Sequence, residues 1–600
     1  MSGRSPARPH KGARRPAASR QERGAARKDP GGRVSVALVW PGGYRAGMSS
    51  LGFLWCYSLV NARQEALAER VFLPEDPRAP VRSLESGRPL SSFALVAASL
   101  SWENDYWVFP EILRRGGVPP ERSARGNGSY PLICAGGIGP WSNPWALFPF
   151  ADLIFTGEGE ICWEAALDCA AERGFGRLDA LSRTRALAGR VPGALAPGLL
   201  PEELTGASDP DRLRAALAAF APVAPPRLPY PFPARSLPPA SPVWAPGAEF
   251  SGMRLVEISR GCPHGCRFCL AGHVYRPHRP WDAKKILEAV ARPNPWSGED
   301  PFPADAPVGL VGAAAADHPG FEGIVEEILA TGRRISFSSL RLSALGEKAL
   351  RLLAAGGLRG AAVAPEAGTE ELRARIAKGL SEPEILEGAR ILGSAGLRTL
   401  KLYFMFGLPG ETDGDLEAAA DLSFRILQAA RGAARGKPGV LAAASFSCFV
   451  PKPHTPFEDE PLLTEGEIRR RSALLRALFA RRGGVSLRLE SPRSAVIQGV
   501  IARGGVAAGQ MVRALLESSG REGPALRLAG VTDDHPAFRP VPPDGPRPWR
   551  IIASAPGKEY LAEEARKAPL GRESPPCPPA LRCGRCAACG SAGPGGPAGG

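Results

Sequence analysis

The sequence predicts an α/β protein in which two regions of parallel β-sheet follow one another along the chain. Short apolar runs bounded by Gly or Pro alternate with helical segments, which is the pattern of parallel sheets covered by helices. The chain has 600 residues, enough for three or four domains. Its composition is that of a globular protein, with 44% hydrophobic and 22% charged residues.

The first region, residues 34–189, is expected to form a doubly wound parallel sheet of Rossmann type. Helices are expected at 51–70 and 163–172, and strands at 34–40, 71–73, 93–100, 132–137 and 151–157. Ligands of such sheets bind beyond the carboxyl ends of the strands. The expected binding edge therefore consists of the loops 41–47, 99–105, 136–140 and 157–160.

Three further segments follow this sheet. Residues 190–250 are rich in Pro and are expected to form a semi-rigid extended connector. Residues 251–460 contain six strand–helix repeats, which fit an open, partial (β/α)6 barrel with its site at the carboxyl ends of the strands. Residues 461–570 are expected to form a small α+β accessory region, with a helix at 464–482 and a strand at 485–489.

Both ends of the chain differ from the rest in composition. Residues 1–33 hold ten Lys or Arg and two acidic residues, and so contribute +8 to the net charge of +15. Such an arm cannot bury a core and is expected to be disordered. It is suited to holding RNA phosphates, and a solubilising leader is the alternative. Residues 571–600 are expected to be a Cys cluster followed by a disordered tail.

No apolar run approaches the roughly 20 residues of a membrane helix. We also find no apolar stretch of the signal-peptide type at the N-terminus. The sequence therefore predicts a cytoplasmic protein, without a membrane partner, whose thiols stay reduced and are available for metal.

The strongest chemical signal is a set of three cysteines, Cys262, Cys266 and Cys269, in one short loop after a predicted strand. Thiolates are the usual ligands of iron–sulfur clusters, and a catalytic metal keeps one coordination position open. Three thiols can hold three corners of a cubane cluster and leave the fourth iron free. The alternatives are a zinc knuckle completed by His264 or His273, and an electron-transfer cluster.

A second thiol set lies near the end of the chain, at Cys577, Cys583, Cys586 and Cys589. Four cysteines can close a tetrahedral zinc site or hold a second iron–sulfur cluster. Both alternatives remain open for this site.

The C-x-x-x-C-x-x-C spacing is that of radical S-adenosylmethionine (radical SAM) enzymes. Together with Gly47–Phe53, Ala68–Pro74, Arg82–Ser86 and the loops of the first sheet, it resembles one uncharacterised bacterial radical SAM family. That family pairs a cobalamin-binding-like domain with a radical SAM core and a C-terminal Cys cluster. The similarity covers most of residues 34–590.

The resemblance implies two cofactors and a set of residues that bind them. A 4Fe–4S cluster would be held by Cys262, Cys266 and Cys269, and its open iron would chelate SAM. Phe268 would lie beside the adenine, and Gly407 would let the backbone approach it. Ala313 and Ala314 replace the commoner Gly-Gly-Glu segment, whose backbone carbonyls receive the SAM amino group.

The remaining SAM contacts implied by the resemblance are polar. Glu366 would accept hydrogen bonds from the ribose hydroxyls or the amino group. Ser339 and Arg341 would hold the SAM carboxylate, for which a guanidinium fork is well shaped.

The resemblance leaves cobalamin uncertain. The D-x-H-x-x-G motif, whose His ligates cobalt in such domains, is absent from the loop that begins at Pro41. Cobalamin would have to bind without a His ligand, or the domain is an empty scaffold. We favour the empty scaffold.

The expected function is reductive cleavage of SAM to a 5′-deoxyadenosyl radical that modifies a macromolecule, namely tRNA, rRNA or a ribosomal protein. A reductant such as flavodoxin or ferredoxin would supply the electron. The alternatives are a cobalamin-dependent radical SAM methyltransferase and a non-catalytic iron–sulfur protein that binds RNA or transfers electrons.

Overall fold

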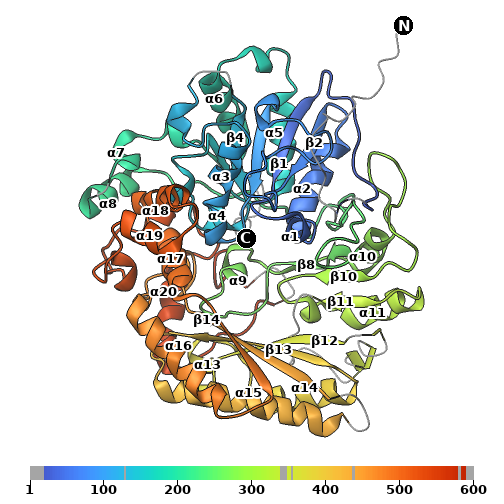
Figure 1. Cartoon of the computed structure of the whole chain (residues 1–600), viewed down its shortest axis with the longest axis vertical. Helices are drawn as coiled ribbons and strands as arrows, with labels where there is room; N and C mark the ends of the chain where they lie inside the picture. The colour runs from blue at the N-terminus through green and yellow to red at the C-terminus, as the bar shows by residue number, and fades with distance from the viewer. Residues whose placement is uncertain are drawn as a thin grey trace, which may run out of the picture.

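The computed structural model describes residues 19, 21–126, 130–207, 209–337, 348–349, 351–352, 356–357, 359–434, 439–578 and 583–589. Two parallel-sheet regions form the body of the molecule. The N-terminal sheet lies at the top of Figure 1 and the second region at the bottom, with the labelled segments β8, β10 and α9 between them. The predicted α/β class, a doubly wound sheet followed by a partial (β/α)6 barrel, is confirmed.

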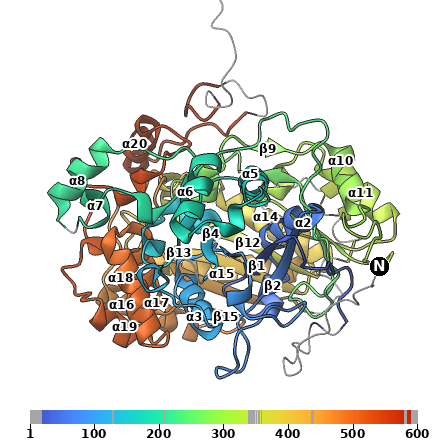
Figure 2. The same cartoon turned by 90° about the horizontal axis from the view of Figure 1, so that it is seen from above.

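The N-terminal sheet has six strands in the order β2-β1-β3-β4-β5-β6, all parallel except β6. Its strands are β1 (Val34–Val39), β2 (Ala66–Val71), β3 (Leu95–Ser99), β4 (Leu132–Gly136), β5 (Leu153–Phe155) and β6 (Ala194–Leu195). Its helices are α1 (Tyr44–Gly47), α2 (Leu51–Ala62), α3 (Val108–Arg115), α4 (Ile138–Ser142), α5 (Gly159–Ala170) and α6 (Ala180–Arg190). Viewed from above, these elements cover the centre of the molecule (Figure 2).

One element of this sheet differs from its prediction. The sequence favoured a helix from residue 51 to 70, but α2 ends at Ala62 and β2 already begins at Ala66. Every residue of β2 is buried, and Asn61 holds the turn between the two elements through hydrogen bonds to the backbone of Ala68. Burial between α2 and β1 therefore outweighs the helix propensity of Ala, Leu, Glu and Arg.

The expectation of disorder is wrong for residues 21–33. The Lys28 ammonium donates hydrogen bonds to the carbonyls of Asn61, Arg63 and Ala66 at 2.6, 2.6 and 3.1 Å. The buried Ala26 N–H donates to the Tyr57 hydroxyl at 2.8 Å. Lys28 thus satisfies carbonyls at the end of α2 and at the start of β2. Residues 1–18 lie outside the described part.

The connector is partly helical, with α7 (Glu202–Thr205) and α8 (Pro210–Ala219) before an extended stretch. The second region begins with β7 (Arg254–Glu257), β10 (Val308–Val311) and β11 (Ile335–Phe337), which form a parallel sheet in the order β11-β10-β7. A second parallel sheet has the order β12-β13-β14-β15, with β12 (Gly360–Glu366), β13 (Thr399–Phe406), β14 (Leu441–Cys448) and β15 (Val485–Leu489).

The helices of this region are α10 (Ala283–Val290), α11 (Phe321–Ala330), α13 (Glu370–Arg375), α14 (Glu382–Ser394), α15 (Asp413–Ala433) and α16 (Glu465–Ala480). Helix α14 begins with a capping box of Ser381 and Glu384, which satisfies its first free N–H groups. The strand expected at 485–489 is present as β15 and pairs with β14. The core sheet therefore extends beyond the expected boundary at residue 460.

The rest of the accessory region is helical, with α17 (Pro492–Arg503), α18 (Val506–Glu517), α19 (Glu522–Leu528) and α20 (Lys558–Lys567). Its helices join the two sheet regions. The buried Asn143 amide donates to carbonyls at the end of α17, at 3.1 Å from Ile501, 3.0 Å from Ala502 and 2.9 Å from Gly504.

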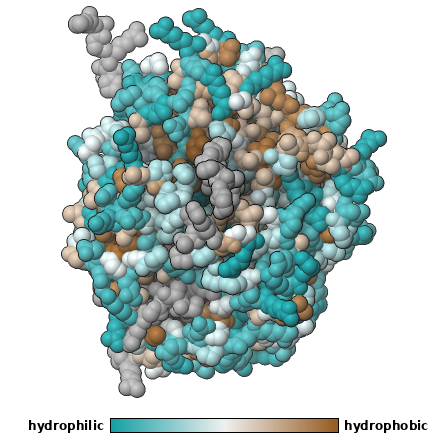
Figure 3. Space-filling view, turned by 180° about the vertical axis from the view of Figure 1, so that it is seen from behind, coloured by the Kyte–Doolittle hydropathy of each residue, from teal (hydrophilic) through white to brown (hydrophobic). Residues whose placement is uncertain are grey.

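Within the described residues, the structure has no helix long and apolar enough to span a bilayer. The face seen from behind is mostly hydrophilic, with hydrophobic residues in separate groups (Figure 3).

Candidate functional site

The three-cysteine loop is closed at its base by a short two-stranded ribbon. Strand β8 (Ser259–Arg260) leads into the loop, and β9 (Arg279–Pro280) follows α9 (Ala271–Val274) out of it. The two strands are antiparallel, and Arg260 lies opposite Arg279. The loop therefore begins directly after β7 at the carboxyl end of the core strands, as the sequence predicted.

The thiols of this loop are partly buried and influence one another. Burial, together with the other two thiols, raises the pKa of Cys262 to about 12. Burial and Cys266 raise the pKa of Cys269 to about 11. Cys262 and Cys269 hold their protons firmly and need a cation to become ligands, since metal-bound cysteines are thiolates.

The donor set fits an iron–sulfur cluster, because three thiols lie in one loop and affect each other's ionisation. Among the described residues, no group of three or more His, Cys, Asp or Glu side chains is arranged as a metal-ion site. His264, in the same loop, is paired with Asp317 at 2.8 Å between Nε2 and Oδ1.

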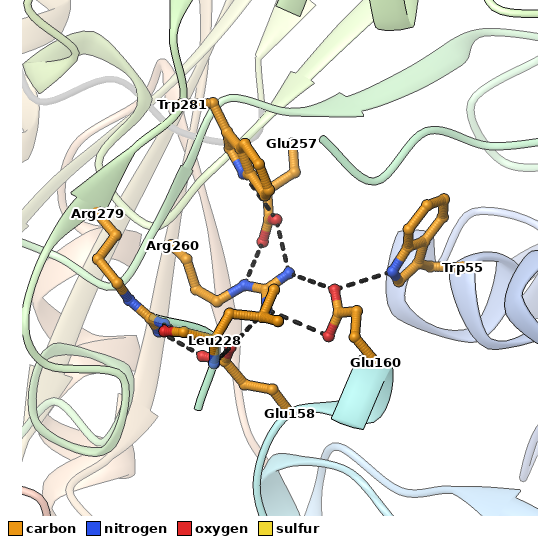
Figure 4. Close-up of polar contacts among 8 residues, drawn as sticks. All are labelled: Trp55, Glu158, Glu160, Leu228, Glu257, Arg260, Arg279 and Trp281. Atoms are coloured by element: carbon orange, nitrogen blue, oxygen red, sulfur yellow. Dashed lines mark hydrogen bonds and ion pairs between the residues drawn. The ribbon is translucent and has the colours of Figure 1, made fainter. Parts of the chain in front are cut away.

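A buried network of charges holds the base of the loop (Figure 4). The Arg260 guanidinium donates to Glu158 Oε2 at 2.8 Å, to Glu160 Oε1 at 2.9 Å and to Glu257 Oε2 at 2.8 Å. Arg279 also donates to Glu158, whose Oε2 accepts the Leu228 N–H at 2.8 Å. Trp55 Nε1 donates to Glu160 at 2.9 Å, and Trp281 Nε1 donates to Glu257 at 3.1 Å.

Glu158 is the centre of this network and comes from the N-terminal sheet. Burial favours protonation of its carboxyl, but Arg260 and Arg279 outweigh burial and hold its pKa below the ordinary value. Glu158 is 3% exposed. Because Arg260 and Arg279 lie on the two strands of the ribbon, one carboxylate from the first domain clamps both ends of the cysteine loop.

A cavity of about 380 Å³ lies between the two regions, beside this network. Its wall includes three of the four expected binding loops of the first sheet, namely 99–105, 136–140 and 157–160. Gly261 and Ala313 of the core also line it. Ala313 therefore lies where a ligand can reach it, whereas Ala314 is buried and does not line the cavity.

This cavity offers no histidine ligand for a corrinoid in the described part of the chain. Drug-sized ligands occupy pockets of roughly 300–1,000 Å³, and cobalamin is larger than such ligands. No His is among the residues that line the cavity in the described part of the chain. The observed arrangement agrees with the absence of the D-x-H-x-x-G motif from the loop at Pro41.

Three of the other predicted SAM-binding residues, Phe268, Glu366 and Gly407, lie in the described part of the chain. Glu366 and Gly407 lie at the carboxyl ends of β12 and β13. Phe268 packs with Met405 against a buried cluster that includes Leu408 and Phe449. The Glu366 carboxylate is paired with Lys378 Nζ at 3.1 Å, and both charges affect the pKa of Cys269. Glu366 has a φ of 69°, a strained value that is concentrated at functional sites.

Gly407 is required for a structural reason in addition to the predicted one. Its φ is +83°, and a Cβ atom would lie 2.7 Å from Leu463 Cδ1. Its N–H donates to the buried Glu411 carboxylate. Ser339 and Arg341 lie outside the described residues, so their roles stay predictions.

The C-terminal thiols lie against the cysteine loop of the core. The Cys577 N–H donates to the Pro263 carbonyl at 2.7 Å, and the Gly557 N–H donates to the Cys586 carbonyl at 3.0 Å. Burial lowers the pKa of Arg276, but Tyr560 and the Cys586 thiol outweigh it and hold that pKa above the ordinary value. Burial and the other three thiols raise the pKa of Cys589.

Sequence reasoning missed Glu158, Arg260, Arg279 and Lys378. The first two stood inside the motifs Gly157–Glu160 and Glu257–Cys262, but a charge in a motif does not reveal its partner. Lys378 carries no local signal, because only the fold of β12 and α13 brings it to Glu366.

Two family models match the chain. Residues 52–194 match radical SAM proteins, N-terminal, and residues 256–423 match the radical SAM superfamily. An uncharacterised protein of Methanocaldococcus jannaschii is 26% identical over 476 residues, which are 78% of this chain and 88% of that protein.

Similar solved structures include OxsB, a cobalamin-dependent S-adenosylmethionine radical enzyme, with aqua-cobalamin and S-adenosylmethionine bound. Its TM-score is 0.39 at 15% identity, covering 65% of this chain and 52% of that one. Streptococcus suis SuiB bound to S-adenosylmethionine has a TM-score of 0.25 at 10% identity, covering 39% and 46%. The chain spans about half the length of these solved structures. The two matched models, with the three-cysteine loop at the end of β7, identify the chain as a radical SAM protein with a radical SAM N-terminal domain.

Proposed function

We propose that this radical SAM enzyme cleaves SAM reductively and uses the product radical to modify a macromolecule, namely tRNA, rRNA or a ribosomal protein. Family membership implies a 4Fe–4S cluster and SAM. The observation that carries the proposal is the thiol loop at the carboxyl end of β7, with Phe268 and the Glu366–Lys378 pair beside it. These groups combine metal ligands with apolar and charged contacts for a nucleoside that carries an amino acid.

In this proposal Cys262, Cys266 and Cys269 hold the cluster. When bound, the cluster supplies the electron that splits the sulfonium of SAM into methionine and a 5′-deoxyadenosyl radical. Phe268 packs on the adenine, and Glu366 accepts hydrogen bonds from the ribose or the amino group, oriented by Lys378. The backbone at Ala313 faces the cavity and receives the amino group, and Gly407 shapes the turn beside the adenine.

A soluble reductant such as flavodoxin or ferredoxin supplies the electron, because radical SAM enzymes generally need one. Free thiols in two clusters require a reducing compartment, and we propose the cytoplasm.

The C-terminal thiols form a second metal site in this proposal. Burial together with Cys577, Cys583 and Cys586 raises the pKa of Cys589, and the Cys577 N–H donates to the Pro263 carbonyl of the first loop. Either zinc or a second iron–sulfur cluster suits four thiols. Iron, sulfide and zinc analysis of wild type against Cys586→Ser decides between them. A Cys586→Ser protein with unchanged metal content would contradict the second site.

The test of the main proposal is SAM turnover by anaerobically purified, reconstituted protein under a strong reductant, read by mass spectrometry. We expect 5′-deoxyadenosine from wild type and none from Cys266→Ala. The matched control is Cys169→Ala, which removes a thiol of α5 far from the loop in sequence and should keep activity. Wild type that holds a cluster and binds SAM but forms no 5′-deoxyadenosine, with or without total RNA or ribosomes, would refute the proposal.

A further inference from the structure

The inner face of the β12–β15 sheet is open and unusually polar for a barrel wall. On β13 the residues Leu400, Leu402, Phe404 and Phe406 are buried, whereas Lys401 and Tyr403, which point the other way, are exposed. In a closed barrel the inward side chains form a packed core. Figure 1 shows α14 and α15 on one side of this sheet and the half of the molecule with the thiol loop on the other.

Strand register places three long side chains on this inner face. Tyr403 lies opposite Ser445 of β14, and Ser445 lies opposite Arg488 of β15. Neighbouring strands are about 4.8 Å apart, so the Tyr403 and Arg488 backbones are about 10 Å apart. Lys401 is two residues, or about 7 Å, along β13 from Tyr403. The residues between them on β14, Ala443, Ser445 and Ser447, are small and leave room for a ligand.

These three side chains are available. Tyr403 is 42% exposed, and both Lys401 and Arg488 are exposed. None of the three has a hydrogen-bond or ion-pair partner within the described ranges. The nearby acids are engaged elsewhere: Glu490 accepts the Cys448 N–H at 3.2 Å, and Glu366 is paired with Lys378.

We propose that this face binds a nucleotide of a single-stranded RNA segment, which deepens the proposed function and rests on it. The base stacks on Tyr403, and Lys401 and Arg488 hold the flanking phosphates. Aromatic stacking combined with cations that follow the backbone is how proteins bind single strands. The hydroxyls of Ser445 and Ser447 lie on the same face and can pair with a ribose 2′-OH, which distinguishes RNA from DNA.

The position of this face relative to the thiol loop supports the assignment. Met405, the next inward residue of β13 after Tyr403, packs against the same buried cluster as Phe268 of the thiol loop. A base on Tyr403 would therefore lie one pleat below the proposed SAM site, where a radical formed at the loop can reach it. A nucleotide offers both a phosphate for the cations and a base for the Tyr403 ring, whereas an apolar peptide has no charge for the cations and an acidic one has no ring to stack.

The experiment measures binding of full-length protein to a fluorescein-labelled, single-stranded RNA of mixed sequence by anisotropy, over a range of salt concentrations. We expect Tyr403→Ala to raise Kd by about 5- to 150-fold and Tyr403→Phe to keep wild-type affinity, because stacking needs the ring and not the hydroxyl. Arg488→Gln should reduce the slope of log K against log salt by about 1. A DNA strand of the same sequence should bind more weakly than the RNA.

The matched control is Arg390→Gln, the same charge change on the outer helix α14, where Arg390 is 50% exposed. Equal Kd values for wild type, Tyr403→Ala and Arg390→Gln would overturn the inference. So would ultraviolet crosslinks that map only to residues 1–33, or tighter binding of a ribosomal protein than of RNA at this face.

Binding is measured without SAM cleavage, so the two proposals fail separately. Wild type that binds RNA through Tyr403 but forms no 5′-deoxyadenosine would overturn the proposed function alone. Wild type that forms 5′-deoxyadenosine, yet binds RNA no better than Tyr403→Ala does, would overturn this inference alone.

Discussion

The two sheet regions are built from the same parallel strands but use their carboxyl ends in opposite ways. The loops at the carboxyl end of the N-terminal sheet pack against protein: a Cβ on Gly137 would lie 2.3 Å from the Leu100 carbonyl oxygen, and one on Gly157 would lie 2.6 Å from that of Pro226. The core strands end in thiols and in an inner face that is exposed. The loops of the first sheet thus contact neighbouring protein and also line the cavity between the regions, whereas the core strands leave an exposed inner face.

Two buried carboxylates show the same difference. Glu158 of the first region has two arginine partners that hold its pKa below the ordinary value. Glu411 of the second region has Arg471 and the Gly407 N–H, and burial raises its pKa to about 7. The paired Glu158 carboxylate keeps its charge at neutral pH, whereas the Glu411 carboxyl gains or loses a proton as the pH changes around 7. The contact between the domains therefore depends on a carboxylate that stays ionised, whereas the turn at Gly407 depends on a carboxyl whose charge changes near neutral pH.

The largest expected effect comes from breaking the clamp with Glu158→Gln. This change removes the buried carboxylate that pairs with Arg260 and Arg279. Removing one partner of a buried ion pair lowers the free energy of unfolding by about 3–5 kcal/mol. We expect a lower midpoint of thermal unfolding and less iron bound per chain after reconstitution. The matched control is Glu172→Gln, an exposed partner of Arg190 in the same domain, which should behave as wild type. Equal iron content in both variants would show that the clamp does not support the thiol loop.

The next effect concerns the open end of the core. Glu366→Gln removes the charge that pairs with Lys378 beside Cys269. Hydrogen bonds to charged groups contribute about 1.5–3 kcal/mol, so the Kd for SAM should rise about 10- to 150-fold. Calorimetry on reconstituted protein measures this change, with the exposed Glu371→Gln of α13 as control. An unchanged Kd would remove Glu366 from the SAM site.

A smaller effect is a pH dependence from Glu411. Its pKa is about 7 in the folded chain against an ordinary 4.5, so the folded state keeps a proton that the unfolded state has released. Stability should therefore fall as pH rises from about 4.5 to about 7, by about 1–3 kcal/mol. Glu411→Gln cannot titrate and should flatten this part of the curve of melting temperature against pH. The exposed Glu417→Gln should keep the wild-type slope.

The comparison also predicts an effect of zero. Because no His lines the cavity at the carboxyl end of the first sheet in the described part of the chain, hydroxocobalamin should not remain with the protein after gel filtration. Corrinoid absorbance that coelutes at one equivalent would show that the two regions separate to admit it. The core would then share its site with a second cofactor.

The sequence by itself determined the radical SAM family of this protein and most strands of its first sheet. Apolar runs predicted β1, β3, β4 and β5 because buried parallel strands are apolar along their whole length. Cys262, Cys266 and Cys269 were evident as candidate ligands because the three thiols lie within one short loop. The same locality made the C-terminal thiols recognisable.

Only the tertiary structure decided which distant groups meet. Glu158 and Arg260 are 102 residues apart and Cys577 is far from Pro263, so neither contact leaves a local pattern. Residues 66–71 became a strand, and residues 21–33 became ordered, because burial and unpaired carbonyls of neighbouring elements outweighed local propensity. The exposure of Tyr403 follows from a barrel that does not close around it. Local preferences are small, and the surroundings that a segment meets in the fold determine its final state.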